Sequence, residues 1–238
     1  TYPCIEMVCM KAPFTLYLLF FLLLGMSEKS TAQDWANLAK YENENTLLTP
    51  KKSGEKRIVL MGDSITEFWL QIHPEFFKDK PYIDRGISGQ TTSQMLIRFR
   101  PDAINLQPDV VVILAGVNDV AGNTGPTTPE KILGNIKSMV ELAKNNDIKV
   151  ILCAVLPAND FYWRPNDKAA ETIIHLNQLI HSYAKQHHIP YVDYHTTMTD
   201  KKNGLPKEFS DDGVHPNLKG YQTMEPLLEK AIQQVLTK

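Results

Sequence analysis

Cysteine is scarce in this chain of 238 residues. There are three cysteines, and two of them, Cys4 and Cys9, fall in the first dozen residues. The third, Cys153, lies in the apolar stretch 150–155. If the N-terminal segment is removed, as predicted below, Cys153 is the one cysteine left, and a single cysteine cannot form an intramolecular disulfide. A cysteine on an apolar strand usually packs as a small hydrophobe. We therefore expect the folded domain to be held together by its core, which its length permits.

An excess of charge of either sign is also lacking. The chain has 25 Lys and Arg against 27 Asp and Glu, and its formal net charge is -2. Nucleic-acid binding requires a basic surface, so we predict no nucleic-acid partner. The acidic residues do not cluster with histidine at metal-ligand spacing, which disfavours a metal-dependent phosphoesterase. We predict neither a metal nor another cofactor.

No apolar run reaches the ~20 residues that a membrane-spanning helix needs. The longest run, residues 14–24, follows Lys11 and precedes a polar stretch in which Ser30 and Ala32 are spaced as at a signal-peptidase site. We predict that residues 1–32 are a secretory signal peptide cleaved after Ala32. The mature chain would then be periplasmic or secreted, without membrane insertion; an uncleaved N-terminal anchor is the alternative.

Apolar strands and amphipathic helices alternate along the rest of the chain. Residues 33–54 are polar and predict a lead-in at the edge of a domain that spans 55–238. Right-handed crossovers between parallel strands place helices on both faces of a sheet. The pattern therefore predicts an α/β fold: a three-layer α/β/α domain, flavodoxin-like, with a central parallel sheet of about five strands. The predicted strands are 57–62, 81–85, 110–114, 148–156 and 189–193, and the helices are 64–77, a segment around 95–99, 129–143, 168–187 and 218–236.

Four loops carry residues that could act chemically, and several of them follow strands that end at one edge of the sheet. In open α/β sheets ligands bind beyond the carboxyl ends of the strands. Each loop alone is more simply explained as a turn or a helix cap. The loops are Gly62-Asp63-Ser64, Gly86-Ile87-Ser88-Gly89, Gly116-Val117-Asn118-Asp119 and Asp212-Gly213-Val214-His215.

Taken together, the loops supply what a serine nucleophile requires. A serine hydroxyl needs a neighbouring base, and that base needs an orienting carboxylate. His215 lies three residues after Asp212, close enough for a carboxylate to hold the imidazole. Fixed donors for a developing oxyanion can come from a glycine N–H and an asparagine amide. His195 is a rival base and Asp211 a rival acid, although the three-residue spacing favours Asp212.

These four segments, in this order, resemble the motifs of the SGNH hydrolases, also called GDSL-type lipases and esterases. The resemblance spans nearly the whole predicted mature chain, with Ile65 where the family usually has Leu. It implies Ser64 as nucleophile, His215 as general base and Asp212 as its orienting acid. It also implies an oxyanion hole made by the N–H groups of Ser64 and Gly89 and the side chain of Asn118.

The first motif differs from the nucleophile elbow of α/β-hydrolases. Thr66 stands where the second glycine of Gly-x-Ser-x-Gly would be. We therefore expect Ser64 at the start of the first helix, where the helix dipole favours negative charge. Asp63 is a candidate substrate-binding residue, and capping that helix is its alternative role.

A loop with three consecutive aromatic residues, 159–164, is expected near the same edge. We interpret Tyr162, Trp163 and Arg164 as substrate-binding residues, with the aromatic rings as walls and the guanidinium as a polar contact. The alternative is that the aromatic residues brace the sheet edge.

The predicted activity is that of a serine esterase that hydrolyses short-acyl, principally O-acetyl, esters of small molecules or glycans. The loop 86–92 is similar to that of platelet-activating-factor acetylhydrolase-like members and of carbohydrate deacetylases, which favour short acyl groups. The alternatives are a lysophospholipase or thioesterase, and a non-catalytic carbohydrate-binding domain on the same scaffold.

Overall fold

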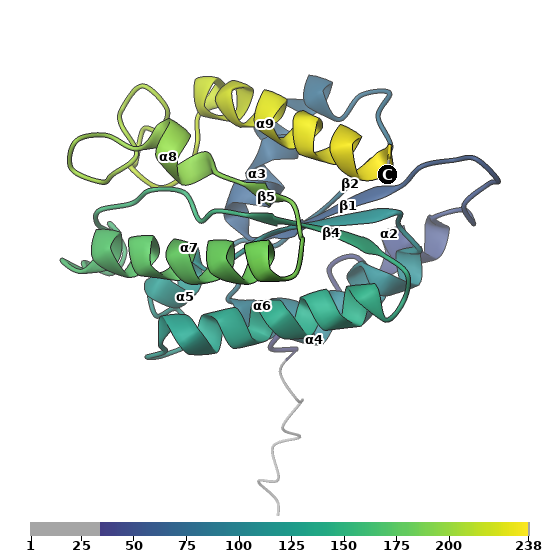
Figure 1. The fold of residues 1–238 in the computed structure, drawn as a ribbon, viewed down its shortest axis with the longest axis horizontal. Helices are drawn as coiled ribbons and strands as arrows, with labels where there is room; N and C mark the ends of the chain where they lie inside the picture. The colour runs from purple at the N-terminus through teal and green to yellow at the C-terminus, as the bar shows by residue number, and fades with distance from the viewer. Residues whose placement is uncertain (1–33, 238) are drawn as a thin grey trace, which may run out of the picture. The chain divides into compact units, whose positions relative to one another are not determined.

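Five parallel strands form the centre of the computed structural model, which describes residues 34–237 (Figure 1). Their spatial order is β2-β1-β3-β4-β5, and all neighbouring pairs are parallel. The predicted five-stranded parallel sheet is confirmed. The strands are β1 (Ile58–Gly62), β2 (Tyr82–Gly86), β3 (Val110–Leu114), β4 (Lys149–Cys153) and β5 (Tyr191–Val192).

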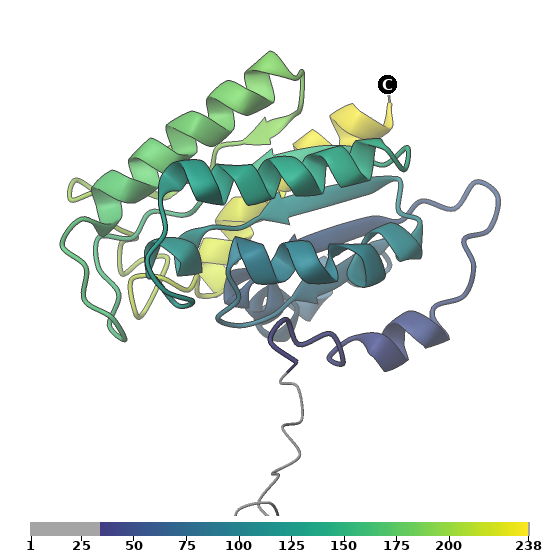
Figure 2. The same cartoon turned by 90° about the horizontal axis from the view of Figure 1, so that it is seen from below.

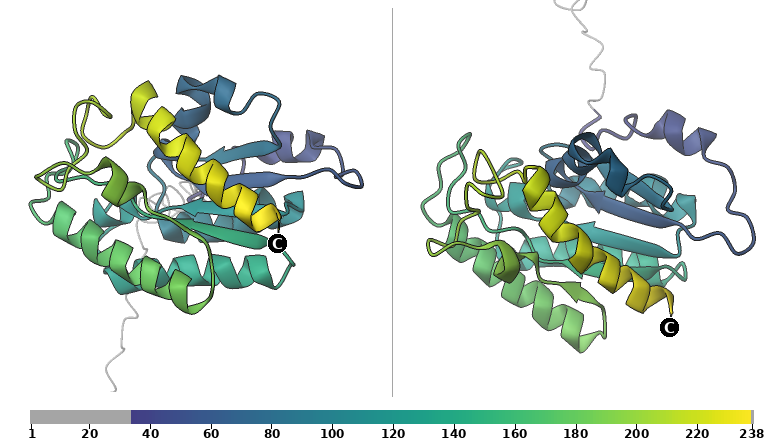
Figure 3. Two further views of the ribbon diagram at one scale, coloured as in Figure 1. Left: turned by 45° about the horizontal axis from the view of Figure 1, so that its top comes forward. Right: turned by 90° about the horizontal axis from the view of Figure 1, so that it is seen from above.

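Long helices cover both faces of this sheet, as predicted. One face carries α3 (Ser64–Ile72) and α9 (Leu218–Leu236), and Figure 3 shows α9 running across it. The other face carries α4 (Thr92–Asp102), α6 (Pro129–Lys144) and α7 (Ala169–Gln186), which lie side by side in Figure 2. No helix among residues 34–237 is long and apolar enough to cross a membrane.

The central strands are buried along their whole length. Every residue of β1 and β3 is buried, because helices cover both faces and leave no side that could be polar. The predicted strand 148–156 was too long, since β4 ends at Cys153. Beyond it, Val155 exchanges two hydrogen bonds with the side chain of Asn177, at 2.8 and 2.9 Å, instead of pairing with a strand. The residues beyond Cys153 are therefore apolar because they are buried in a loop, not because they extend the strand.

Shorter helices fill the connections. α3 ends at Ile72 rather than at 77, because the residue before Pro74 disfavours helical backbone. The remaining short elements are α2 (Glu42–Leu47), α5 (Val117–Val120), α8 (Tyr194–Met198) and two 3₁₀ turns at Pro74–Phe76 and Ile104–Leu106.

The lead-in packs on the domain edge next to β2. The Tyr41 hydroxyl donates to the carbonyl of Gly86, and the Gln90 side chain donates to the carbonyl of Ala36. Residues from Asp34 onward therefore belong to the same compact unit as the sheet. The predicted signal peptide, 1–32, lies outside the described residues.

Candidate active site

Ser64, His215 and Asp212 form a continuous hydrogen-bonded chain. The Ser64 Oγ lies 2.9 Å from His215 Nε2, and His215 Nδ1 lies 2.7 Å from Asp212 Oδ2. A carboxylate only accepts hydrogen bonds, so the proton on the imidazole must sit on Nδ1. Nε2 is then free to accept the serine proton. The arrangement can therefore activate a serine oxygen as a nucleophile.

β1 and α3 place the serine. Ser64 is the first residue of α3, directly beyond the end of β1. Its strand lies beside β3, where the order of the sheet changes direction, and ligands bind at such switch points. At the first helical position the N–H of Ser64 has no acceptor within the helix, which leaves it available to an anion.

Asp63 caps the N-terminus of α3 and so stabilises the turn that carries Ser64. Its side chain is 1% exposed, and Oδ1 accepts the N–H of Ile65 at 3.0 Å as the helix cap. The predicted substrate contact of Asp63 is at odds with this placement, because the buried carboxyl does not reach the hollow above Ser64.

A tight loop before α9 holds the acid and the base together. Asp212 Oδ1 accepts the N–H groups of Val214 and His215 at 2.9 and 2.8 Å, while Oδ2 faces the imidazole. Burial alone would raise the pKa of Asp212, but the hydrogen bonds from His215 and the two backbone N–H groups hold it below its ordinary value. The carboxyl therefore stays ionised beside the imidazole.

The residues expected to form an oxyanion hole surround one hollow of about 410 Å³. Gly89, Asn118 and Ser64 all line it, together with His215. The Asn118 amide donates one N–H to the carbonyl of Gln90 at 3.1 Å. An amide nitrogen has two hydrogens, so its second N–H can serve a ligand.

Asp119 has a structural role beside Asn118. Its carboxylate accepts the N–H of Thr92 at 2.8 Å and the Thr92 hydroxyl at 2.6 Å. These bonds tie the loop after β3 to the start of α4.

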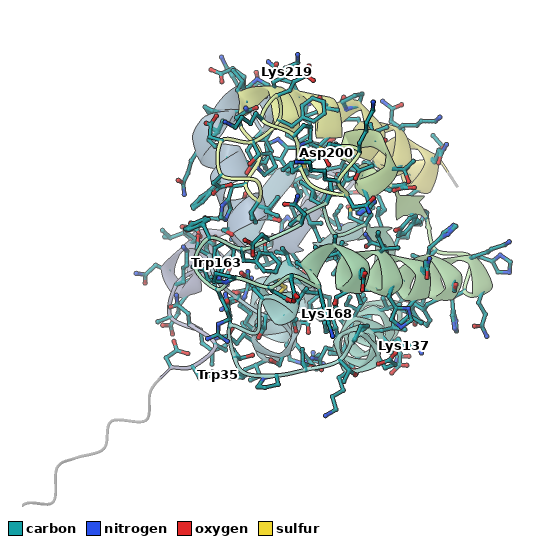
Figure 4. The ribbon with its side chains drawn as sticks, turned by 90° about the vertical axis from the view of Figure 1, so that its left-hand side faces the viewer. Trp35, Lys137, Trp163, Lys168, Asp200 and Lys219 are labelled. Atoms are coloured by element: carbon teal, nitrogen blue, oxygen red, sulfur yellow. The ribbon has the colours of Figure 1, made fainter. Side chains whose placement is uncertain are left out.

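The aromatic loop contributes one wall of the hollow, and its residues divide into separate roles. Phe161 is fully buried and packs in the core, as the bracing alternative expected. Tyr162 and Trp163 are 68% and 37% exposed and line the hollow. Figure 4 views the side where the strands end, with Trp163 among the loops. Arg164 differs from the prediction, because its guanidinium donates to the carbonyl of Gly122 and does not line the hollow.

Three residues that line the hollow had no predicted site role, namely Phe68, Ser88 and Asn123. Phe68 has core-like helical spacing, but its ring centroid lies 5.3 Å from that of His215, and the ring of Trp163 lies 6.3 Å from the same imidazole. Asn123 lies four residues beyond the third motif and hydrogen-bonds to Asn118. Its place follows from the turn after α5, where Gly122 has a left-handed backbone (φ +72°), and a glycine just past a helix end is the local signal for such a turn.

The rival residues lie elsewhere. His195 is half-buried in α8, where burial lowers its pKa, and it does not line the hollow. Asp211 is exposed, and Asp212 is the residue that meets the imidazole. A larger groove of about 640 Å³ lies at the opposite end of the strands, beside Ile148 and Ile189, away from the serine. Residues 34–237 contain no group of three acidic, histidine or cysteine side chains arranged to hold a metal ion.

Comparison with known proteins agrees with this geometry. Residues 60–223 match the GDSL-like Lipase/Acylhydrolase family. The solved structure of a GDSL-like lipase from Bacteroides thetaiotaomicron has a TM-score of 0.82 and 50% identity, over 84% of this chain and 98% of that one.

Two curated relatives are more distant. The isoamyl acetate-hydrolyzing esterase of Saccharomyces cerevisiae is 24% identical over 75% of this chain and 86% of its own. The acetylxylan esterase of Xylanibacter ruminicola is 28% identical over 56% of this chain but only 30% of its own length. Together with the family match, the fold and site show that the chain belongs to the GDSL-like lipase/acylhydrolase (SGNH hydrolase) family and is a carboxylic ester hydrolase.

Proposed function

We propose that this protein hydrolyses short-acyl esters, principally O-acetyl groups on carbohydrate, through an acyl-Ser64 intermediate. The observation that carries the proposal is the hydrogen-bonded chain from Ser64 through His215 to Asp212, which opens into a hollow lined by oxyanion donors.

The reaction follows from the roles of these groups. Ser64 Oγ attacks the ester carbonyl carbon while its proton passes to His215 Nε2. The oxyanion that forms accepts hydrogen bonds from the N–H groups of Ser64 and Gly89 and from the Asn118 amide. The bond to the alcohol then breaks, and the alcohol oxygen takes the proton from Nε2. Water attacks the acyl-serine, gives a proton to Nε2, and the serine oxygen leaves with that proton.

Two features support a small acyl group on a sugar. The ring centroids of Phe68 and Trp163 lie 5.3 and 6.3 Å from that of His215, and both side chains line the hollow, so aromatic rings border the space beside the reacting atoms. At the mouth, Tyr162 presents a ring that is 68% exposed, and flat aromatic surfaces suit the apolar faces of sugars. The names of two relatives, acetylxylan esterase and isoamyl acetate-hydrolyzing esterase, both denote enzymes that act on acetyl esters.

Ser64→Ala tests the catalytic role directly. We expect hydrolysis of p-nitrophenyl acetate to fall at least ~10³-fold, because the nucleophile is lost while the fold remains. A fluorophosphonate probe should label the wild type at Ser64, located by peptide mass spectrometry. Ser182→Ala, at an exposed position of α7, is the matched control and should behave as wild type. Activity retained in Ser64→Ala would contradict the assignment.

A substrate panel tests the acyl and alcohol preference. Acetylated xylo-oligosaccharides should have a higher kcat/KM than octanoyl esters, acyl-CoA thioesters or lysophospholipids. The reverse order would replace the proposal with a lysophospholipase or thioesterase activity. An unlabelled, inactive wild type that still binds sugars would indicate a carbohydrate-binding domain.

A further inference from the structure

We propose that Asn123 is a positioning residue that fixes the orientation of the Asn118 amide, and that the indole of Trp163 in turn fixes Asn123. The three side chains form a relay from the substrate wall to the oxyanion hole. This inference rests on the proposed function, in which Asn118 serves the oxyanion.

The Asn123 side chain makes three hydrogen bonds, which use both of its N–H groups and its oxygen. Its Oδ1 accepts the indole N–H of Trp163 at 3.0 Å. Its Nδ2 donates to Asn118 Oδ1 at 2.9 Å and to the carbonyl of Gly89 at 3.1 Å. Two of these partners carry proposed oxyanion donors, and the third is the wall of the hollow.

The indole of Trp163 determines which way round the amide groups of Asn123 and Asn118 are oriented. An indole N–H can only donate, so the oxygen of Asn123 must face Trp163. The NH₂ group of Asn123 then faces Asn118, which must present its oxygen. The NH₂ group of Asn118 is left pointing to the Gln90 carbonyl and the hollow. A reversed Asn118 would set two NH₂ groups against each other and aim an oxygen at the oxyanion.

The backbone holds the two asparagines in contact. Their positions are five residues apart, and the N–H of Asn123 donates to the carbonyl of Asn118 at 3.0 Å, just beyond the short helix α5. The side-chain bond therefore closes a ring that the main chain already forms. Little conformational freedom is lost when the relay forms, so it can hold a donor in place before substrate binds.

The relay predicts a loss in turnover rather than in substrate binding. In Asn123→Asp the side chain has no donor, so it repels Asn118 Oδ1 and the Gly89 carbonyl. We expect kcat for p-nitrophenyl acetate to fall ~10- to 100-fold with KM within ~3-fold, since one oxyanion donor is worth ~10²- to 10³-fold. Asn146→Asp, a surface asparagine remote from the hollow, is the matched control and should keep wild-type kcat.

Coupling between the members distinguishes a relay from separate contacts. Trp163→Phe keeps an aromatic wall but removes the donor, and we expect a smaller fall in kcat. The double variant with Asn123→Ala should lose no more than Asn123→Ala alone, because both changes break one chain of bonds. Trp35→Phe, at a half-exposed indole outside the hollow, is the control for loss of an indole N–H. Additive losses, or an unchanged kcat in a folded Asn123→Asp, would overturn the proposal.

An activity-independent measurement separates this inference from the proposed function. In ¹⁵N-resolved hydrogen exchange, the Trp163 indole N–H should exchange more slowly than that of Trp35, and Asn123→Ala should abolish the difference. Equal exchange in the wild type would overturn the relay. A wild type that is inactive and unlabelled by fluorophosphonate would refute the esterase proposal, and the exchange measurement would then decide the relay alone.

Discussion

Three carboxyl groups lie buried beneath the candidate active site. Burial raises the pKa of Asp63 and of Asp84 to about 7, and that of Asp119 to about 6. Asp84 Oδ1 accepts the N–H of Gly86 at 2.7 Å, whereas Oδ2 has no hydrogen-bond partner in the described part of the chain. These groups hold the loops that carry Ser64 and Gly89, and their protonation links stability to pH.

Asp84→Asn should flatten the pH dependence of stability. The pKa of Asp84 is about 7 in the folded protein, against an ordinary value of 3.8. In the window between these two pH values, folded Asp84 keeps a proton that the unfolded chain has lost. Wild-type stability therefore falls as pH rises through the window. When the pH is raised from 5 to 8, we expect the free energy of unfolding of the wild type to fall by about 2 kcal/mol more than that of Asp84→Asn.

Urea denaturation at both pH values measures this difference. Asp167→Asn, at an exposed loop position, is the control and should keep the wild-type slope. If the free energy of unfolding changed equally with pH in the wild type and in Asp84→Asn, Asp84 would not be the group that takes up the proton.

At the scale of elements, the position of the nucleophile depends on how closely α3 approaches β2. A Cβ at Gly86 would lie 2.2 Å from the backbone nitrogen of Glu67 and 2.7 Å from the carbonyl oxygen of Asp63. Backbone atoms cannot move aside as a flexible side chain can. The first turn of α3, which carries Ser64, therefore rests directly on the end of β2.

Gly86→Ala should displace α3 and lower both stability and activity. We expect a loss of about 2–3 kcal/mol in the free energy of unfolding, because overpacking a fixed contact forces backbone shifts. The turnover should fall with it, since Ser64 moves relative to His215.

Gly134→Ala is the matched control, because a Cβ at this exposed position of α6 would meet no atom within 4 Å. It should gain about 0.5–1 kcal/mol, the usual difference between Ala and Gly in a helix. Denaturation and ester hydrolysis of both variants test the pair. If Gly86→Ala kept the stability and activity of the wild type, α3 would be able to move away from β2 without loss of stability.

At the scale of the whole molecule, the compact unit begins at Asp34, two residues beyond the expected cleavage after Ala32. The first residues of this unit are already anchored, since Gln94 and Gln90 donate to the carbonyls of Trp35 and Ala36. Cleavage after Ala32, as predicted from the sequence, would leave this anchored unit whole. Within residues 34–237 the one cysteine, Cys153, is buried, and its burial raises the pKa of the thiol to about 12.

Export can be tested by N-terminal sequencing. When the chain is expressed in a secreting host, we expect the protein outside the cytoplasm to begin at Gln33. Ala32→Arg should block this cleavage, because signal peptidase needs a small residue there. Protein recovered outside the cytoplasm with residues 1–32 still attached would favour the uncleaved anchor.

The sequence by itself determined the layered fold and the residues of the hydrogen-bonded chain. Buried strands such as β3 are continuous apolar runs, and Ser64, Asp212 and His215 lie in short motifs whose residue types are readable locally.

Tertiary structure alone decided how the surrounding residues are used. The roles of Asn123, Phe68 and Arg164 depend on which distant side chain each one meets. The apolar residues after Cys153 predict a continued strand, but Val155 hydrogen-bonds to the side chain of Asn177 instead. Local patterns report burial and backbone preference, whereas hydrogen-bond partners are chosen only when remote loops meet at the edge of the sheet.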